Sequence, residues 1–224
     1  MKHISTIVLF FLLSFAASAQ DLPIDSSYAN SHYKQRLQFF RQMPDSKNEI
    51  VFLGNSITEA GEWQELIPGK NVINRGISGD VSFGVIARLD EVLSSKPKKI
   101  FLLIGINDLK RGIPAAIIVK NYKRIIGQVK LTSPKTQLIL QSILPVNELM
   151  LGNEYKRITN ARVNEVNSLL QQLAASEKLT FVDLHPVFEG KDGQMNRDYT
   201  TDGIHLKMPA YIFWVNLLKS KGLL

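Results

Sequence analysis

The stretch VFLGNSITEA, residues 51–60, joins a run of apolar residues to a polar turn that contains one serine. Its first residues, from Val51 to Gly54, are typical of a strand that is buried on both faces, because no polar side chains alternate with the apolar ones. Two roles fit Ser56, which follows this run. It can cap the helix that begins there, or it can be a nucleophile presented at the end of a strand.

Apolar runs of strand length recur along the chain and alternate with helical patterns. This alternation is typical of strand–helix–strand units, whose right-handed crossovers build a parallel sheet with helices on both faces. We therefore predict an α/β protein, a three-layer α/β/α sandwich around a central parallel sheet of about five strands with a flavodoxin-like fold. The predicted strands are residues 49–54, 72–74, 99–105, 137–143 and 179–184.

Helical patterns fill the intervals between these strands. Residues 154–177 carry apolar side chains that step by three or four positions, which indicates one buried helix face. Residues 81–94 are predicted to form one continuous helix, and a last helix is predicted to start near Pro209. This last helix is expected to bury Ile212, Val215 and Leu218, with Phe213 as a further candidate. Further helices are predicted at residues 28–43 and 114–131.

The length of 224 residues and the hydrophobic fraction of 45% fit one domain with a sizeable core. Residues 1–19 differ from the rest, because Lys2 precedes an apolar run that ends in Ala17-Ser18-Ala19. This pattern predicts a secretory signal peptide with its cleavage site, and the alternative is a retained N-terminal anchor. We therefore expect a signal peptide at 1–19, a single domain at 20–224, and export to the periplasm or the extracellular space without stable membrane insertion after signal removal.

The chain contains no cysteine, which excludes disulfides, thiolate metal sites and a cysteine nucleophile. The formal net charge is +7, but lysine and arginine are spread thinly, and the runs at 96–99 and 120–124 are interpreted as solvated faces. No nucleic-acid partner is therefore expected. A phosphate-binding G-x-x-x-x-G-K-[ST] loop and clustered carboxylates are both missing, so we expect no cofactor and no metal. The sequence does not indicate an oligomeric state.

The candidate catalytic residues lie just beyond the predicted strands, where ligands bind in open parallel sheets. A serine nucleophile needs a base, and the base needs a group that orients it. The motif Asp202-Gly-Ile-His205 supplies both, since the carboxylate can fold back onto Nδ1 and leave Nε2 for a serine. Taken alone, this motif is more often a capped loop with a surface histidine. His185, with Asp183 two residues before it, is a rival base, whereas His32 precedes the sheet and is a weak candidate.

Two further strand ends offer hydrogen-bond donors for the oxyanion of an ester-hydrolysis intermediate. In NRGISGD, residues 74–80, Gly79 can expose its backbone N–H because it has no Cβ. In GIND, residues 105–108, the amide of Asn107 is a side-chain donor. The alternatives are an ordinary turn glycine at Gly79 and an Asx-turn or helix cap at Asn107.

Taken in order, the motifs GNSIT, ISGD, GIND and DGIHL resemble the four blocks of the SGNH/GDSL family of serine esterases and acylhydrolases. The resemblance covers residues 49–224 and is greatest to the branch that contains the platelet-activating-factor acetylhydrolase catalytic subunits and bacterial acetylesterases. It implies a triad of Ser56, His205 and Asp202. It also implies an oxyanion hole made by the Ser56 N–H, the Gly79 N–H and the Asn107 amide.

One residue departs from the pattern of the family. Asn55 stands where these proteins usually have Asp, which preserves size and hydrogen-bonding reach but removes a charge. We expect this change to tune activity and not to abolish it. The G-x-S-x-G elbow of ordinary α/β-hydrolases is also missing, because residues 54–58 read G-N-S-I-T.

The resemblance implies a serine esterase that removes acetyl groups. The signal peptide predicts that this esterase is secreted, and an exported enzyme would meet polymers outside the cytoplasm, so O-acetylated carbohydrate is the first substrate candidate. The expected ligand is therefore a small-molecule or glycan ester. The first alternative is a lysophospholipase or thioesterase for longer acyl chains, with an apolar groove lined by residues 143–152. The second alternative is a non-catalytic ligand-binding protein that retains the fold.

Overall fold

The computed structural model describes residues 25–224, so the predicted signal peptide lies outside the described residues. Its core is a parallel sheet of five strands in the order β2-β1-β3-β4-β5. Every predicted strand is present, and the sheet confirms the predicted α/β fold class. The strands are β1 (Ile50–Gly54), β2 (Val72–Gly76), β3 (Lys99–Leu103), β4 (Gln137–Gln141) and β5 (Thr180–Val182).

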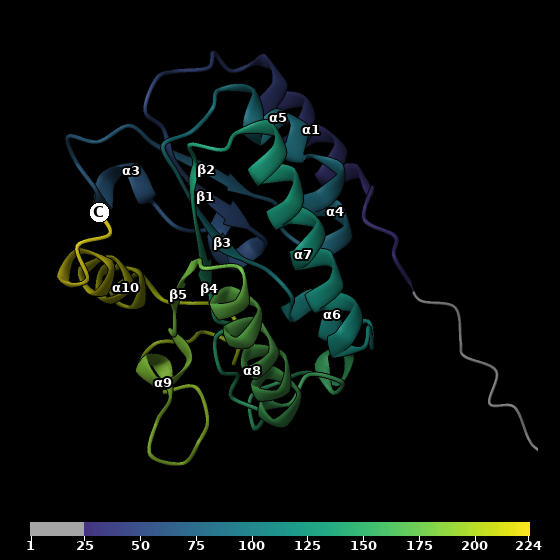
Figure 1. The fold of residues 1–224 in the computed structure, drawn as a ribbon. Helices are drawn as coiled ribbons and strands as arrows, with labels where there is room; N and C mark the ends of the chain where they lie inside the picture. The colour runs from purple at the N-terminus through teal and green to yellow at the C-terminus, as the bar shows by residue number, and fades with distance from the viewer. Residues whose placement is uncertain (1–24) are drawn as a thin grey trace, which may run out of the picture.

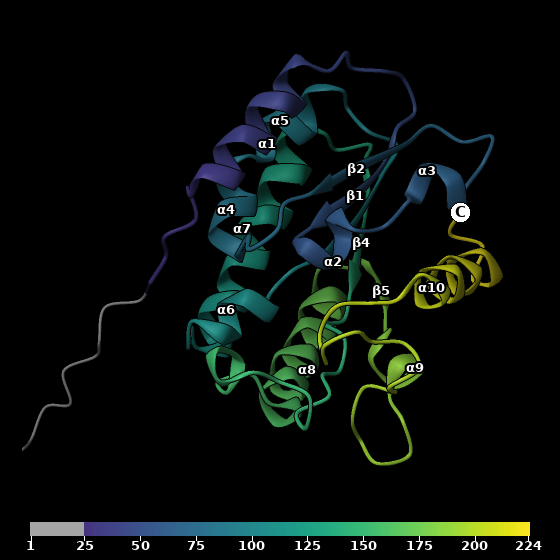
Figure 2. The same ribbon diagram turned by 180° about the vertical axis from the view of Figure 1, so that it is seen from behind.

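Helices cover both faces of the sheet and form the outer layers of the sandwich (Figures 1 and 2). One face carries α4 (Ser82–Ala87), α5 (Leu89–Ser94), α7 (Ala115–Thr132) and α8 (Asn160–Ser176), with α1 (Ser31–Gln42) beside α4. The other face carries α3 (Trp63–Leu66) and α10 (Met208–Ser220). The short elements are α2 (Ser56–Glu59), α6 (Ile106–Lys110), α9 (His185–Phe188) and the 3-10 turn η1 (Asn153–Tyr155).

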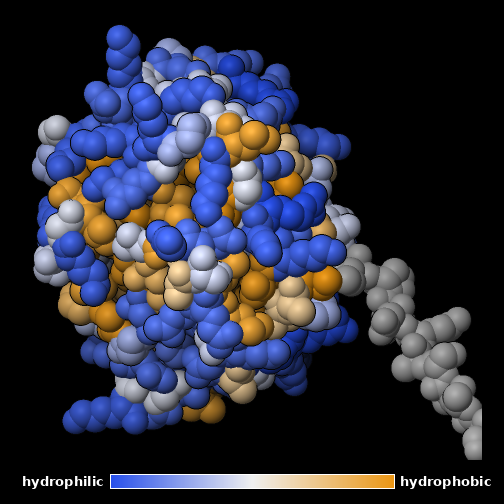
Figure 3. Space-filling model, viewed as in Figure 1, coloured by the Kyte–Doolittle hydropathy of each residue, from blue (hydrophilic) through white to orange (hydrophobic). Residues whose placement is uncertain are grey.

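The outer surface agrees with helices that bury one face against the sheet and expose the other. Seen from the side of α7 and α8, the surface is mostly hydrophilic, and hydrophobic atoms gather in a band between the hydrophilic side chains (Figure 3). Within residues 25–224, no helix combines the length and the apolar character needed to cross a membrane.

Two helix predictions are wrong, one in the continuity of the helix and one in its first residue. Residues 81–94 form two helices, α4 and α5, because Arg88 between them has a non-helical backbone with φ −118° and ψ 12°. The helix predicted at 154–177 starts only at Asn160, where the hydroxyl of Thr159 accepts a hydrogen bond from the N–H of Arg162 at 3.3 Å. This capping fixes the start of the helix, and the four residues between η1 and α8 are irregular.

The prediction for α10 is confirmed for Val215 and Leu218, which are buried, but it is wrong for Ile212. Ile212 and Phe213 are 50% and 38% exposed, whereas Tyr211 and Trp214 are buried. The reason is an aromatic cluster on this face of the sheet. Trp63 of α3 stacks on Phe52 of β1 at 3.9 Å between ring centroids and meets Trp214 edge-on at 5.0 Å. Because large rings contribute most to burial, α10 turns its aromatic side inward and leaves the aliphatic Ile212 outside.

A buried ion pair joins Arg88 to Asp80, a residue of the loop that follows β2. The guanidinium of Arg88 contacts the carboxylate of Asp80 at 2.9 Å, and both side chains are fully buried. Arg88 also donates to the carbonyl of Gly54 at the end of β1, at 3.0 Å. Burial raises the pKa of Asp80 to about 6, although the charge of Arg88 and its hydrogen bond oppose the shift. This pair therefore ties the end of β1 to the loop after β2.

We expect Arg88→Met to lower the free energy of unfolding by about 3–5 kcal/mol, because it leaves the Asp80 carboxylate buried without its partner. Urea unfolding followed by circular dichroism measures this change. The control is Arg41→Met, which breaks the exposed pair of Arg41 and Asp90 and should cost less than about 1 kcal/mol. Adding Asp80→Asn to Arg88→Met should recover part of the loss. Equal effects of the Arg88 and Arg41 variants would contradict the assigned role of the buried pair.

Candidate active site

The strand register brings three loops to one rim of the sheet. β1 lies between β2 and β3, and its last residue, Gly54, pairs with Gly76 on one side and with Leu103 on the other. All three strands are parallel, so their carboxyl ends lie together. The connection after β1 leads to β2 on one side, whereas β3 lies on the opposite side. This is the point at which the strand order reverses, where open α/β sheets bind ligands.

Ser56 is the first residue of α2, directly after β1. The helix cap is Asn55, whose Oδ1 accepts a hydrogen bond from the N–H of Ile57 at 3.0 Å. The interpretation of Ser56 as the capping residue is therefore wrong, and its hydroxyl is available for other contacts. Asn55 is fully buried, and its Nδ2 has no hydrogen-bond partner within residues 25–224. Asn in place of Asp thus keeps the cap acceptor and buries an unpaired amide nitrogen.

The hydroxyl of Ser56 meets a histidine from the far end of the chain. Ser56 Oγ lies 3.0 Å from Nε2 of His205, and His205 Nδ1 lies 2.6 Å from Oδ2 of Asp202. The other carboxylate oxygen of Asp202 accepts hydrogen bonds from the backbone N–H groups of Ile204 at 3.0 Å and His205 at 2.8 Å. Burial raises the pKa of Asp202, but these hydrogen bonds outweigh it and hold the pKa below its ordinary value. The carboxylate is therefore ionised where it faces the imidazole.

The loop that carries His205 is fixed from two directions. Its two sides pair with each other through an antiparallel bridge between Thr200 and Leu206. The carbonyl of Gly203 accepts a hydrogen bond from the N–H of Asn147, in the segment after β4, at 2.8 Å. Directly after the loop, α10 is tied to α2 because the hydroxyl of Tyr211 donates to the carbonyl of Ile57 at 2.8 Å. These contacts hold the histidine against α2.

Gly79 lies in the loop after β2 with a φ of +80°, a region that favours glycine. Its backbone N–H donates no hydrogen bond to another group of residues 25–224, and neither does the N–H of Ser56 at the start of α2. The first N–H groups of a helix have no partner inside the helix, so both groups are free to donate to a bound ligand.

Asn107 lies in the first turn of α6, beyond β3. It does not cap this helix, because the capping position is Gly105. Its Nδ2 donates to the carbonyl of Asp80 at 2.9 Å, which ties Asn107 to the loop of Gly79. A primary amide has two hydrogens, so one remains for a ligand. The neighbouring Asp108 accepts hydrogen bonds from the N–H and the hydroxyl of Ser82, which attaches α6 to α4.

Glu59, which sequence reasoning missed, joins α2 to the loop of Gly79. Its carboxylate accepts hydrogen bonds from the N–H of Ser78 at 2.5 Å and from the Ser78 hydroxyl at 2.6 Å. The same carboxylate lies 3.1 Å from Nε of Arg36 and 3.1 Å from Nε2 of His32, both in α1. Burial raises the pKa of Glu59, but the hydrogen bonds from Ser78 and His32 outweigh it and lower the pKa overall.

His185, the rival base, is not the histidine that meets Ser56. It is buried at the start of α9, and its backbone N–H donates to the hydroxyl of Ser142 at 2.9 Å. Asp183 accepts from the backbone N–H of His185 at 3.2 Å and not from the ring, so the proposed Asp183–His185 pair does not form. The ring lines a separate cavity beside α8, and burial lowers its pKa. Within residues 25–224, no group of three or more His, Asp or Glu side chains is placed to hold a metal ion.

Comparison with known proteins gives a family match over most of the chain. The model of the GDSL-like lipase/acylhydrolase family matches residues 52–211. The α1 subunit of platelet-activating factor acetylhydrolase IB from Bos taurus is 27% identical over 198 residues, which cover 86% of this chain and 81% of the subunit.

Two solved structures illustrate how far the fold is shared. A protein from Streptococcus pneumonia, identified provisionally as a platelet activating factor, is 32% identical with a TM-score of 0.79, and the match covers 85% of this chain and 92% of that protein. The acetylxylan esterase Axe2 from Geobacillus stearothermophilus is 20% identical with a TM-score of 0.64, and the match covers 81% of this chain and 97% of Axe2. The likeness to Axe2 concerns the fold alone.

We expect Glu59→Gln to lower the free energy of unfolding by about 1.5–3 kcal/mol at pH 7, because the charged acceptor of the Ser78 hydrogen bonds is lost. The pKa of Glu59 is lowered by folding, so its stabilising contribution is present above the ordinary carboxyl pKa and is lost as pH falls through the lower, folded value. The difference between wild type and Glu59→Gln should therefore shrink towards acid pH.

Urea unfolding at several pH values between about 7 and 3 measures this difference. Glu65→Gln is the matched control, because Glu65 is an exposed residue of α3 and should change the stability little at any pH. A difference between wild type and Glu59→Gln that stays constant over the whole pH range would contradict the role of the carboxylate charge.

Proposed function

We propose a serine-esterase mechanism for this chain, which belongs to the GDSL-like lipase/acylhydrolase family and is an ester-hydrolysing enzyme. Ser56 is the nucleophile, His205 the general base and Asp202 the group that orients the base. The observation that carries the proposal is the contact of 3.0 Å between Ser56 Oγ and His205 Nε2, continued by the contact of 2.6 Å between His205 Nδ1 and Asp202.

In the first half of the reaction, Nε2 of His205 takes the proton of the Ser56 hydroxyl while Oγ attacks the ester carbonyl carbon. The imidazolium that forms is stabilised by the carboxylate of Asp202, which stays ionised because its pKa is lowered. His205 then gives the proton to the departing alcohol oxygen as the carbonyl–alcohol bond breaks. An acyl group remains on Ser56, and a water molecule, deprotonated by His205, releases it as the acid.

The negative charge that develops on the carbonyl oxygen needs donors that are in place before the reaction begins. We assign this role to the N–H of Ser56, the N–H of Gly79 and the second amide hydrogen of Asn107. The support for this assignment is geometric. The three residues follow three adjacent strands, and Asn107 donates a hydrogen bond to the backbone carbonyl of Asp80, next to Gly79. Fixed donors of this kind cost no reorganisation during the reaction, so each can contribute about 3–4 kcal/mol.

For the substrate, we propose acetyl esters, with O-acetylated carbohydrate as the natural class. The acetyl preference is supported by the similarity to the acetylhydrolase subunit from Bos taurus. The carbohydrate preference is a hypothesis that follows from the proposed export of the protein. For that export we keep residues 1–19 as a signal peptide and residues 20–224 as one domain, so the enzyme would meet polymers outside the cytoplasm.

A longer acyl chain is the second candidate, and one observation favours it. Leu149 is 76% exposed in the segment after β4. This segment lies against the loop of His205, because a Cβ on Gly203 would lie 3.1 Å from the side chains of Met150 and Leu151. The apolar residues 149–151 thus border the proposed site and could contact an acyl chain.

We expect Ser56→Ala to reduce the turnover of 4-nitrophenyl acetate by about 10⁴-fold or more, because the nucleophile is lost while the fold remains. Initial rates and a thermal unfolding curve measure both properties. Ser94→Ala, at an exposed serine, is the control and should keep full activity. A fluorophosphonate probe should label wild type on Ser56, as located by peptide mass spectrometry. Retained turnover in Ser56→Ala, or labelling of another residue, would refute the mechanism.

We expect kcat/KM for 4-nitrophenyl esters to be highest for the C2 acyl group and to fall steadily towards C12. If residues 149–151 bind a long chain instead, each buried methylene contributes about 0.8 kcal/mol and kcat/KM should rise about fourfold per methylene. The release of acetate from acetylated xylan, compared with the release of fatty acid from a lysophospholipid, tests the substrate class directly. A rising chain-length profile together with lysophospholipid cleavage would decide for the second candidate.

A further inference from the structure

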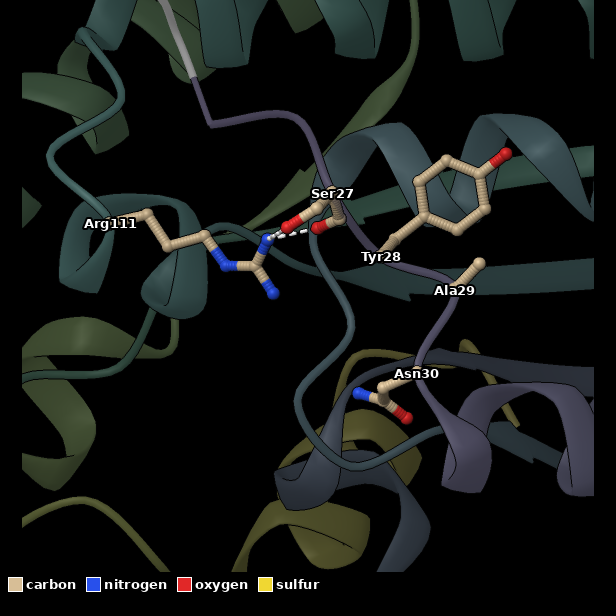
Figure 4. A pocket seen from close by; sticks show the side chains of 5 residues that line it. All are labelled: Ser27, Tyr28, Ala29, Asn30 and Arg111. Carbon is tan, nitrogen blue, oxygen red and sulfur yellow. Dashed lines mark hydrogen bonds between the residues drawn. The ribbon is translucent and has the colours of Figure 1, made fainter.

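A cavity of about 510 Å³ opens between the segment before α1 and the residue that follows α6. Its walls are Ser27, Tyr28, Ala29 and Asn30 on one side and Arg111 on the other (Figure 4). None of these residues belongs to the four motifs from which the catalytic residues were predicted. The cavity is therefore a feature that the proposed mechanism has not used.

The cavity adjoins the proposed oxyanion donors. Arg111 follows directly on α6, the helix that begins with Ile106 and Asn107. On the other wall, the side-chain nitrogen of Asn30 would lie 3.8 Å from a Cβ placed on Gly79. A substrate held by Gly79 and Asn107 would therefore have this cavity next to its reacting carbonyl group.

The polar side chains of the cavity offer hydrogen-bond donors. Nη1 of Arg111 donates to the carbonyl and the hydroxyl of Ser27, while its other terminal nitrogen points away from Ser27 (Figure 4). A guanidinium has five N–H groups, so several remain available. Oδ1 of Asn30 accepts the N–H of Tyr33 at 2.9 Å, so the amide N–H₂ of Asn30 is its free end.

Arg111 is the one charged side chain among the residues of 25–224 that line the cavity. The carboxylate nearest to Arg111 among the described residues is Asp25, at 3.7 Å, and it is 57% exposed, so solvent weakens its effect on Arg111. Arg157 adds a second cation nearby, because its Nη1 donates to the carbonyl of Arg111 at 3.3 Å. Nη1 of Arg111 is taken by Ser27, but Nε and Nη2 form a second two-donor edge of the same guanidinium, and such an edge suits a carboxylate or another oxyanion.

We propose that this cavity binds an anionic group of the ester substrate, with Arg111 as its main partner and the amide of Asn30 as a second donor. The inference rests on the proposed function and narrows its substrate class to esters of acidic compounds. The only carboxyl group of acetic acid is the one that forms the ester. In an acetyl ester the anionic group must therefore belong to the alcohol half. An acidic acetylated sugar unit has this chemistry.

The test compares kcat/KM for matched acidic and neutral esters. The pair 4-acetoxybenzoate and methyl 4-acetoxybenzoate places the carboxylate on the alcohol half. The pair of 4-nitrophenyl hydrogen adipate and 4-nitrophenyl methyl adipate places it on the acyl half. Wild type should prefer the acidic member of the first pair by about tenfold or more, because a charge-assisted bidentate hydrogen bond is gained. A preference in the second pair alone would assign the cavity to the acyl half.

Arg111→Gln should abolish this preference and leave kcat/KM for the neutral esters within about twofold of wild type. Lys110→Gln is the matched control, because it removes the same charge one residue earlier, where the side chain lies over the ring of Tyr155 and does not line the cavity. This control should keep the preference. Arg111→Lys preserves the charge but not the fork, and an intermediate preference is expected.

Two results would overturn the inference: no acidic preference of wild type in either pair, or equal losses of preference in Arg111→Gln and Lys110→Gln. The first result is obtained with wild type alone, so it decides the inference even if Arg111→Gln fails to fold. Failure of the proposed function gives a different result, since Ser56→Ala would then hydrolyse the neutral esters as fast as wild type does.

Discussion

The structure depends on the parallel pairing of β1 with β2 and β3. Side-by-side pairing in register makes the three strands end together, because Gly54 is level with both Gly76 and Leu103. Each strand end then releases a loop at the same rim, and three motifs that are far apart in the sequence become neighbours. A shift of one residue in either pairing would turn every side chain of the shifted strand to the opposite face of the sheet. The burial of all five residues of β1 opposes such a shift, so the hydrophobic core also sets the geometry of the candidate site.

The polar contacts around this rim hold the loops in position more than they stabilise the fold. A buried ion pair is weak evidence for stabilisation, because desolvation offsets much of the attraction between the charges. The pair of Arg88 and Asp80 nevertheless connects the end of β1 to the residue that follows Gly79. Glu59 holds the residue before Gly79 from the other side. A glycine with a positive φ would otherwise be a flexible point in a loop, so these contacts explain how it can present one fixed N–H.

The sequence predicted the strands and the fold class, and Ser56 and His205, which it singled out through their motifs, lie in contact in the fold. It did so because strands buried on both faces have a clear apolar signature and because three of the four motifs lie directly at strand ends. The interruption at Arg88 could not be predicted, since the apolar pattern of residues 81–94 continues across it. The exposure of Ile212 depends on the aromatic cluster around Trp63, which forms only in the folded protein. Glu59 follows Ser56 by three residues and looks like part of a capping box, yet its carboxylate bonds to Ser78, nineteen residues further on.

The molecule thus divides chemistry and recognition between two kinds of segment. Ser56 and the proposed oxyanion donors follow strand ends, and the loop of Asp202 and His205 is fixed by its own bridge and by the N–H of Asn147, so these groups have little freedom. The walls beside them come from irregular segments, namely residues 25–30 before α1, Arg111 after α6 and residues 149–151 after β4. Such segments tolerate sequence change because few buried contacts depend on them. A family can therefore keep one reaction while its members change substrates, and the family motifs cannot reveal the substrate. For this chain, the cation at Arg111 is the most specific chemical feature that the walls provide, so it is there that the substrate has to be sought.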